Sequence, residues 1–181
     1  MRKILFASFV ALLFFASCNT NTTTLSQKEK DRKEIQSIDS TLYAIKDSFN
    51  TVLAKQAMIK FADFAENYQN DSLAANYLFK SAQLAQSLNL GSQTIIYLDK
   101  IITKYPNFKK ISTCYFLKGF VYDNILQDIK NAKKSYQEFI DKFPNDDFVD
   151  DAAALLENLG KSPAELIKSF EDKNKKHLQD K

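Results

Sequence analysis

The chain has 181 residues, a formal net charge of +3 at pH 7, one His, two Cys and three Gly. The only His, His177, lies in the polar C-terminal tail, which argues against a His-based triad and a buried zinc site, and two Cys are too few for a disulfide framework. The near-neutral charge argues against nucleic-acid binding, which requires a clustered basic patch.

Residues 1–17 have the pattern of a secretory signal. A short basic start precedes the apolar run Ile4–Phe15, which is too short to span a bilayer as a helix. The sequence Phe15-Ala-Ser-Cys18 resembles the lipobox of bacterial lipoproteins. The resemblance implies that residues 1–17 are removed and that Cys18 is acylated, which would anchor the chain to a lipid bilayer. A plain secretory signal with an incidental Cys is the alternative.

Residues 18–27 are rich in Asn and Thr and lack periodicity, which predicts a flexible tether behind the acylated Cys18. In lipoproteins of this kind, an Asp directly after the Cys can signal retention in the inner membrane, and an acidic cluster there can signal surface display. Asn19 follows the Cys here. The resemblance therefore implies an anchor in the bacterial outer membrane with the folded part facing the periplasm.

Residues 28–172 are predicted to form one helical domain. Its first helix follows a mixed-charge run and carries apolar residues at helical spacing, namely Ile35, Ile38, Leu42, Ile45 and Phe49. Together with a second helix over Gln56–Asn67 it would form an atypical first hairpin, as is common at the ends of repeat arrays.

A repeat with an offset of 38 residues organises the middle of the domain. Tyr136–Asn145 repeats the pattern of Leu98–Asn107, including the aromatic-Pro-Asn ending, and a fainter copy lies at Phe61–Asn70. The same offset places Tyr77–Leu84 on Tyr115–Tyr122. Repeats of this length indicate stacked supersecondary units.

Each unit is predicted to be a helical hairpin. In the clearest unit, Pro144 ends the second helix, whose apolar face repeats every three to four residues. Gly119 lies inside the first helix, Ile111–Ile125, where it costs about 1 kcal/mol relative to Ala. This cost predicts a close helix crossing at Gly119. Cys114 in the same helix is expected to act as a small hydrophobic residue.

The C-terminal part is predicted to add two more helices. Ala152–Leu159 follows an acidic segment whose charges favour a helix start rather than a calcium site. Ser162-Pro-Ala-Glu165 is a capping box that starts a last helix, with Leu166, Ile167 and Phe170 expected to face inward. Residues 173–181 are expected to be a disordered, Lys-rich tail.

The best unit resembles the tetratricopeptide repeat (TPR) family. Six residues stand at the family's consensus places: Tyr115, Gly119, Tyr122, Ala132, Tyr136 and Pro144. Lys118 and Phe139 depart from the consensus, and the hairpin turn is one residue longer. The resemblance implies an all-α, right-handed superhelical stack of antiparallel helix hairpins.

The resemblance also implies a binding module. TPR proteins line a groove with the first helix of each unit, and that groove accepts a partner segment. The corresponding residues here are Leu78, Ala82, Gln86, Phe116, Phe120, Asp123 and Asn124. Phe116 and Phe120 are the principal candidates, and burial of both by the terminal helices is the alternative. We expect no cofactor, no metal and no enzymatic activity.

The lipobox, the repeat endings and the tail Asn158–Ser162, taken together, resemble two periplasmic groups. The chain resembles the BamD-type lipoproteins of the outer-membrane β-barrel assembly machine and the TPR domain of the coordinator that works with the Tol-Pal system, over roughly residues 57–159. These resemblances imply an envelope scaffold whose partners include β-barrel assembly components. A self-associating structural lipoprotein and, less favoured, a small-ligand or enzymatic accessory protein are the alternatives.

Overall fold

The structure, a computed structural model, describes residues 25–44 and 49–179. In these ranges the chain forms eight α-helices: α1 (Gln27–Ala44), α2 (Thr51–Asn67), α3 (Ala74–Ser87), α4 (Gly91–Lys104), α5 (Ile111–Asn124), α6 (Ile129–Lys142), α7 (Val149–Asn158) and α8 (Pro163–Gln179). The predicted all-α class and TPR-like stack are confirmed. The predicted signal peptide and Cys18 lie outside the described residues.

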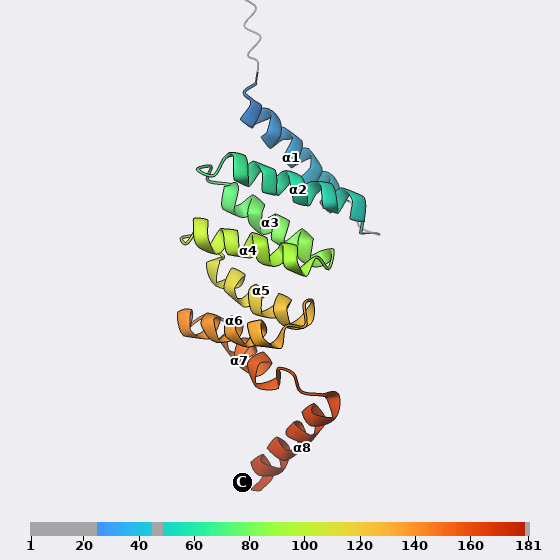
Figure 1. Ribbon diagram of the computed structural model, residues 1–181, viewed down its shortest axis with the longest axis vertical. Coiled ribbons are helices and arrows are strands. Elements are labelled where there is room, and N and C mark those ends of the chain that lie inside the picture. The colour runs from blue at the N-terminus through green and yellow to red at the C-terminus, as the bar shows by residue number, and fades with distance from the viewer. Residues whose placement is uncertain (1–24, 45–48, 180–181) are drawn as a thin grey trace, which may run out of the picture.

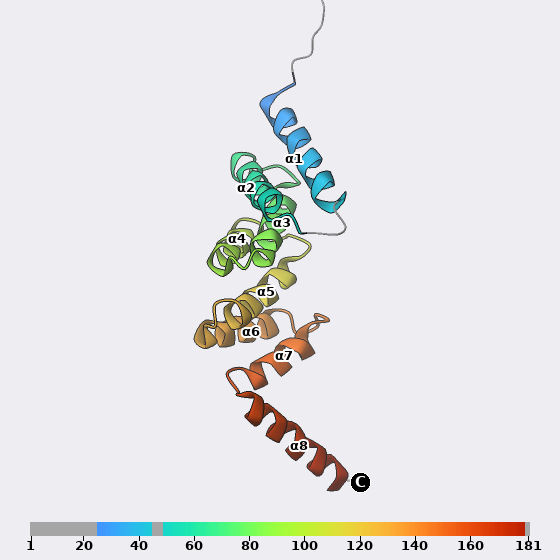
Figure 2. The same ribbon diagram turned by 90° about the vertical axis from the view of Figure 1, so that its right-hand side faces the viewer.

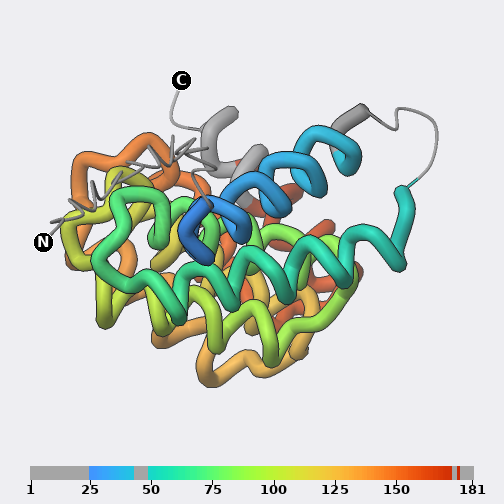
Figure 3. The backbone as a smooth tube through the Cα atoms, turned by 90° about the horizontal axis from the view of Figure 1, so that it is seen from above, coloured from blue at the N-terminus to red at the C-terminus, as the bar shows by residue number. Residues whose placement is uncertain are grey.

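The helices are stacked in chain order along one long axis (Figure 1). In the perpendicular view, α1, α3, α5 and α7 lie on one side of the stack, and α2, α4 and α6 lie on the other (Figure 2). Seen along the axis, the successive helices overlie one another (Figure 3). Each helix from α2 to α6 therefore packs against the helices before and after it in the chain, and α7 packs against α6, as expected for a solenoid.

The same turn occurs three times, where α2, α4 and α6 end. Their C-caps are Tyr68, Tyr105 and Phe143, with φ from −128° to −130° and ψ from 52° to 58°. The carbonyl of each aromatic residue accepts a hydrogen bond from the N–H three positions later. The faint repeat at 61–70 is therefore a true structural repeat, although Gln69 stands where the other copies have Pro.

The predicted close crossing is present at Gly119. A Cβ added there would overlap the ring of Tyr136, which is fully buried on α6. Phe139 and Ala132 on the same face of α6 are also fully buried. The α5–α6 hairpin is thus held by aromatic packing over a residue without a side chain.

The first helix is attached to the stack by Ile35 and by charged groups. Ile35 is 2% exposed. The Asp71 carboxylate at the α2–α3 turn binds Lys28 Nζ at 2.6 Å and Arg32 Nη2 at 2.7 Å, both on α1. The sequence placed Ile45 and Phe49 in this first helix, which the structure describes as Gln27–Ala44. Ile45 lies outside the described residues, and Phe49 lies outside any helix, just before the Asn50 cap of α2, with 53% of its surface exposed.

The last helix differs from its prediction in two respects. Helix α8 extends away from the end of the stack (Figures 1 and 2). Ile167 and Phe170, which were expected to face inward, are 61% and 55% exposed, and Leu166 is half-buried. The helix also continues to Gln179, beyond the expected boundary at 172. The Ser162–Glu165 capping box is formed as predicted, with Glu165 N–H donating to Ser162 Oγ.

Candidate functional site

An apolar surface pocket lies between α5, the first helix of the α5–α6 hairpin, and α7, the helix that follows this hairpin. Its volume is about 380 Å³. It is lined by Phe116 and Phe120 of α5 and by Asp151, Ala154, Leu155 and Asn158 of α7. The residues that line this α5–α7 pocket come from two of the odd-numbered helices, which lie on one side of the stack (Figure 2), and the TPR resemblance predicts partner binding by the first helix of each unit.

The two aromatic residues of the pocket, Phe116 and Phe120, differ in the side chains that pack against them. Phe116 is half-buried in an aromatic cluster, with its ring stacked on Phe148 at 5.1 Å and in edge contact with Phe139 at 5.5 Å. Phe148 begins α7, so the terminal part of the stack covers one face of Phe116. Phe120 is also half-buried and lines the pocket one turn further along α5. Phe120 is therefore the aromatic side chain more available to a partner.

Asp123 and Asn124 continue α5 beyond the pocket. Asp123 is half-buried, and the Tyr136 hydroxyl donates to its Oδ2 at 3.4 Å. Burial raises the pKa of Asp123, although the hydrogen bond from Tyr136 opposes the shift. Burial likewise raises the pKa of the Tyr136 phenol. Asn124 is exposed and donates to the carbonyl of Phe120 at 3.1 Å. Neither residue lines the α5–α7 pocket.

The predicted groove residues of α3 occupy other places. Leu78 is 3% exposed and Ala82 is 1% exposed, because both pack into the hydrophobic core that extends from α1 to α5. Neither offers surface to a partner in this conformation, so their assignment as groove contacts is corrected. Gln86 is half-buried near the end of α3 and is not among the lining residues of the α5–α7 pocket.

Four of the six residues that line the pocket were missed by the sequence prediction. Asp151, Ala154, Leu155 and Asn158 all belong to α7. Ala154 and Asn158 stand 38 positions after Phe116 and Phe120. Extending the repeat offset by one more unit would have found them. The short α7 and its lack of aromatic residues hid that equivalence.

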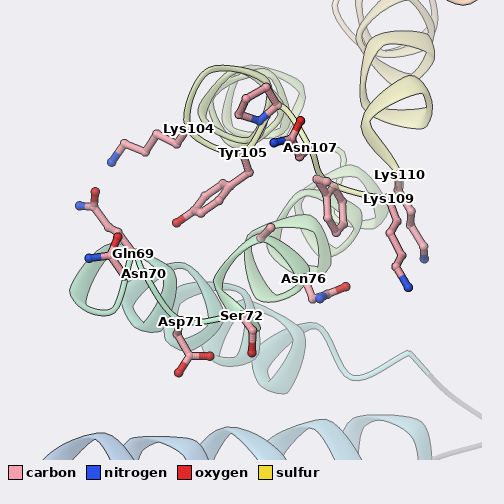
Figure 4. A pocket seen from close by; sticks show the side chains of 13 residues that line it. Gln69, Asn70, Asp71, Ser72, Asn76, Lys104, Tyr105, Asn107, Lys109 and Lys110 are labelled. Atoms are coloured by element: carbon pink, nitrogen blue, oxygen red, sulfur yellow. The ribbon is translucent and has the colours of Figure 1, made fainter.

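A second, more polar hollow of about 540 Å³ lies between the α2–α3 and α4–α5 turns (Figure 4). Three of its charged groups, on Asp71, Lys104 and Lys110, are already engaged elsewhere. Asp71 binds Lys28 and Arg32 of α1, Lys104 Nζ lies 3.4 Å from Glu66, and Lys110 Nζ lies 5.0 Å from the centre of the Phe79 ring. The hollow therefore reflects the packing of two repeated turns.

Cys114 is fully buried in α5, and burial raises the pKa of its thiol to about 12. It thus packs as a small apolar side chain, as expected. Among residues 25–44 and 49–179, no group of three or more His, Cys, Asp or Glu side chains is arranged to hold a metal ion. The helices in the same ranges include none with the length and apolar character of a membrane span.

Comparison with known families places one tetratricopeptide repeat in the chain. Residues 113–146 match the tetratricopeptide repeat family, and this segment contains most of α5 and all of α6. A search of curated proteins found no match to the chain. With the stacked hairpins, the match defines a TPR-containing, all-helical protein. Folds of this kind typically act as non-catalytic scaffolds for protein–protein interaction.

Proposed function

We propose that this protein is a lipid-anchored scaffold of the bacterial outer membrane that faces the periplasm and binds an apolar segment of an envelope protein in the α5–α7 pocket. The observation that carries the proposal is Phe120, an aromatic side chain held half-exposed in a pocket of a TPR stack. Aromatic anchors in such pockets dominate the energetics of protein interfaces.

The shape and chemistry of the pocket favour a protein segment over a small ligand. The pocket is shallow and open, and its lining is mainly apolar, with one carboxylate at Asp151 and one amide at Asn158. Small-ligand sites are usually enclosed and bring several polar groups together. A short helix with one or two large apolar side chains fits this surface better.

Components of the β-barrel assembly machine are the partner class that the lipobox and repeat endings favour. This part of the proposal depends on resemblance, because fold alone does not identify a partner. A self-associating structural lipoprotein is the alternative, and the exposed apolar residues of α8 favour it as a second candidate.

Site-specific photo-crosslinking tests the pocket. We would place a benzophenone amino acid at Asn158, on the rim of the α5–α7 pocket, and use Asp141, an exposed residue of α6, as the matched control position. We expect a discrete adduct from position 158 that is absent from position 141. The adduct should also disappear in Ala154→Trp, which fills the pocket with the core residues intact. Equal adducts from both positions would contradict the proposal.

The anchor is tested separately. We expect labelled palmitate to be incorporated into the wild-type chain and not into Cys18→Ser, and we expect only the wild-type chain to fractionate with outer membranes. Unlabelled wild-type protein would contradict the anchor without affecting the assignment of the pocket.

A further inference from the structure

Helix α8 leaves the stack with its apolar residues exposed. Its first turn is well formed, because the Glu165 carboxylate accepts from both N–H and Oγ of Ser162 at 2.7 Å. Ile167 and Phe170 follow within the next turns and are 61% and 55% exposed. A stable helix with two large apolar side chains in water indicates a missing contact, because exposed apolar surface of this kind marks interaction sites.

The α5–α7 pocket is the complementary surface in the same chain. Its floor is apolar and its rim carries the Asp151 carboxylate, while Asp150 lies beside Asp151 at the start of α7. Helix α8 carries the exposed cations Lys168 and Lys175 as well as the exposed carboxylates Glu171 and Asp172. The exposed apolar residues of α8 match the apolar lining of the pocket, and the two lysines are complementary in charge to the carboxylates of α7.

We propose that α8 of one copy occupies the α5–α7 pocket of a second copy, and that α8 of the second copy occupies the same pocket of the first. This inference rests on the proposed use of the pocket as a protein-binding site, and it names the occupant. A two-fold exchange of one helix covers both exposed surfaces of each chain with a single kind of contact.

The repeat explains why α8 does not fold back on its own α7 as α6 folds on α5. The N–H groups of Cys114 and Ala152 donate to Lys110 and Phe148 in the same way, which aligns α7 with α5 at an offset of 38. Glu157 then takes the place of Gly119. Since a single Cβ at Gly119 would overlap Tyr136, a glutamate at the equivalent place prevents the same close crossing.

The side chain that would meet Glu157 in such a hairpin is Phe170. The side chains of Asp128 and Ser162 cap α6 and α8 by accepting from the N–H three positions later. When the sequences of α6 and α8 are aligned at these two caps, Phe170 takes the position that Tyr136 has in α6. Phe170 therefore has the position of a core aromatic residue and no glycine to pack against in its own hairpin, which leaves it available to another chain.

Sedimentation equilibrium of the full chain carrying Cys18→Ser tests the exchange. We expect a dimer whose dissociation constant rises at least about tenfold in Phe170→Ser and in Phe120→Ser, which corresponds to about 1.4 kcal/mol. Ile59→Ser is the matched control, since Ile59 is also an exposed apolar residue, at 52%, and lies on α2. Ala154→Trp should raise the constant similarly, which keeps the test valid if Phe120→Ser is unstable.

Disulfide trapping distinguishes exchange from closure within one chain. A mixture of the Phe120→Cys chain and the Phe170→Cys chain should give a disulfide-linked heterodimer. The inference is overturned if the protein is a monomer at concentrations on the order of 100 μM, or if it forms a dimer whose dissociation constant Phe120→Ser leaves unchanged. It is also overturned if a chain that carries both Phe120→Cys and Phe170→Cys forms an intrachain disulfide and no dimer. A monomer that still gives the position-158 adduct with another protein would overturn the exchange and leave the proposed function intact.

Discussion

The Tyr136 ring lies directly against the backbone of Gly119, at the crossing of α5 and α6. This contact predicts that Gly119→Leu destabilises the protein by about 1–3 kcal/mol through overpacking. Urea unfolding of the two proteins measures the difference. Gln83→Leu, at an exposed position of α3, should change the free energy of unfolding by less than about 0.5 kcal/mol. Equal stability of Gly119→Leu and wild type would contradict the close contact between Gly119 and Tyr136 at the crossing of α5 and α6.

Cys114 should be unreactive in the folded protein. Its side chain is fully buried and its thiol pKa is raised to about 12, so little thiolate is available for attack. In the Cys18→Ser chain we expect a thiol reagent at about pH 8 to label Cys114 only after denaturation. The denatured chain is the positive control, and rapid labelling of the native chain would contradict the burial.

Asp71 should hold α1 on the stack. Burial opposes ionisation of this carboxylate, but its bonds to Lys28 and to the N–H of Leu73 lower its pKa below the ordinary value. Because the folded-state pKa is lowered, the stabilisation is present above the unfolded-state pKa and is lost as the pH falls through the folded-state value. We expect Asp71→Asn to cost on the order of 1 kcal/mol at neutral pH.

Hydrogen exchange gives the local readout for Asp71. In Asp71→Asn, amide protection should fall in α1 and remain in α5 and α6. Uniform loss of protection across all helices would show that Asp71 has a general role rather than this attachment.

The contribution of Asp123 to the free energy of unfolding should depend on pH in the opposite direction to that of Asp71. Burial raises its pKa, so the folded state binds the proton more tightly than the unfolded state does. The stabilisation is therefore present at low pH and is lost as the pH rises through the folded-state pKa. Relative to wild type, Asp123→Asn should gain stability as the pH rises from the unfolded-state pKa of an Asp, about 3.9, through the raised folded-state pKa. A difference in the free energy of unfolding between Asp123→Asn and wild type that does not change with pH would refute the shift.

Much of the fold follows from the repeat in the sequence. The aromatic residues at 68, 105 and 143 mark the ends of three helices, and the 38-residue offset aligns the hairpins from the sequence alone. Gly119 predicted the close helix crossing because a glycine within a helix lowers stability, which indicates that a neighbouring side chain needs the space. These signals are local and periodic, which is why the sequence carries them clearly.

The candidate site was less predictable because it depends on how the units pack. Leu78 and Phe116 lie on equivalent faces of their helices, 38 positions apart, yet Leu78 is buried whereas Phe116 reaches a surface pocket. The outcome depends on the next helix in the stack and not on helical spacing. The projecting α8 was missed for the same reason, since a capping box predicts a helix start but gives no direction for the helix.

The most direct test of the α5–α7 pocket is the affinity of the protein for the partner crosslinked at position 158, measured by titration with wild type, Phe120→Ser and Ala154→Trp. Both variants should bind at least about tenfold more weakly than wild type, and Ala154→Trp should melt at the wild-type temperature. Unchanged affinity in a folded Ala154→Trp would contradict binding at the pocket.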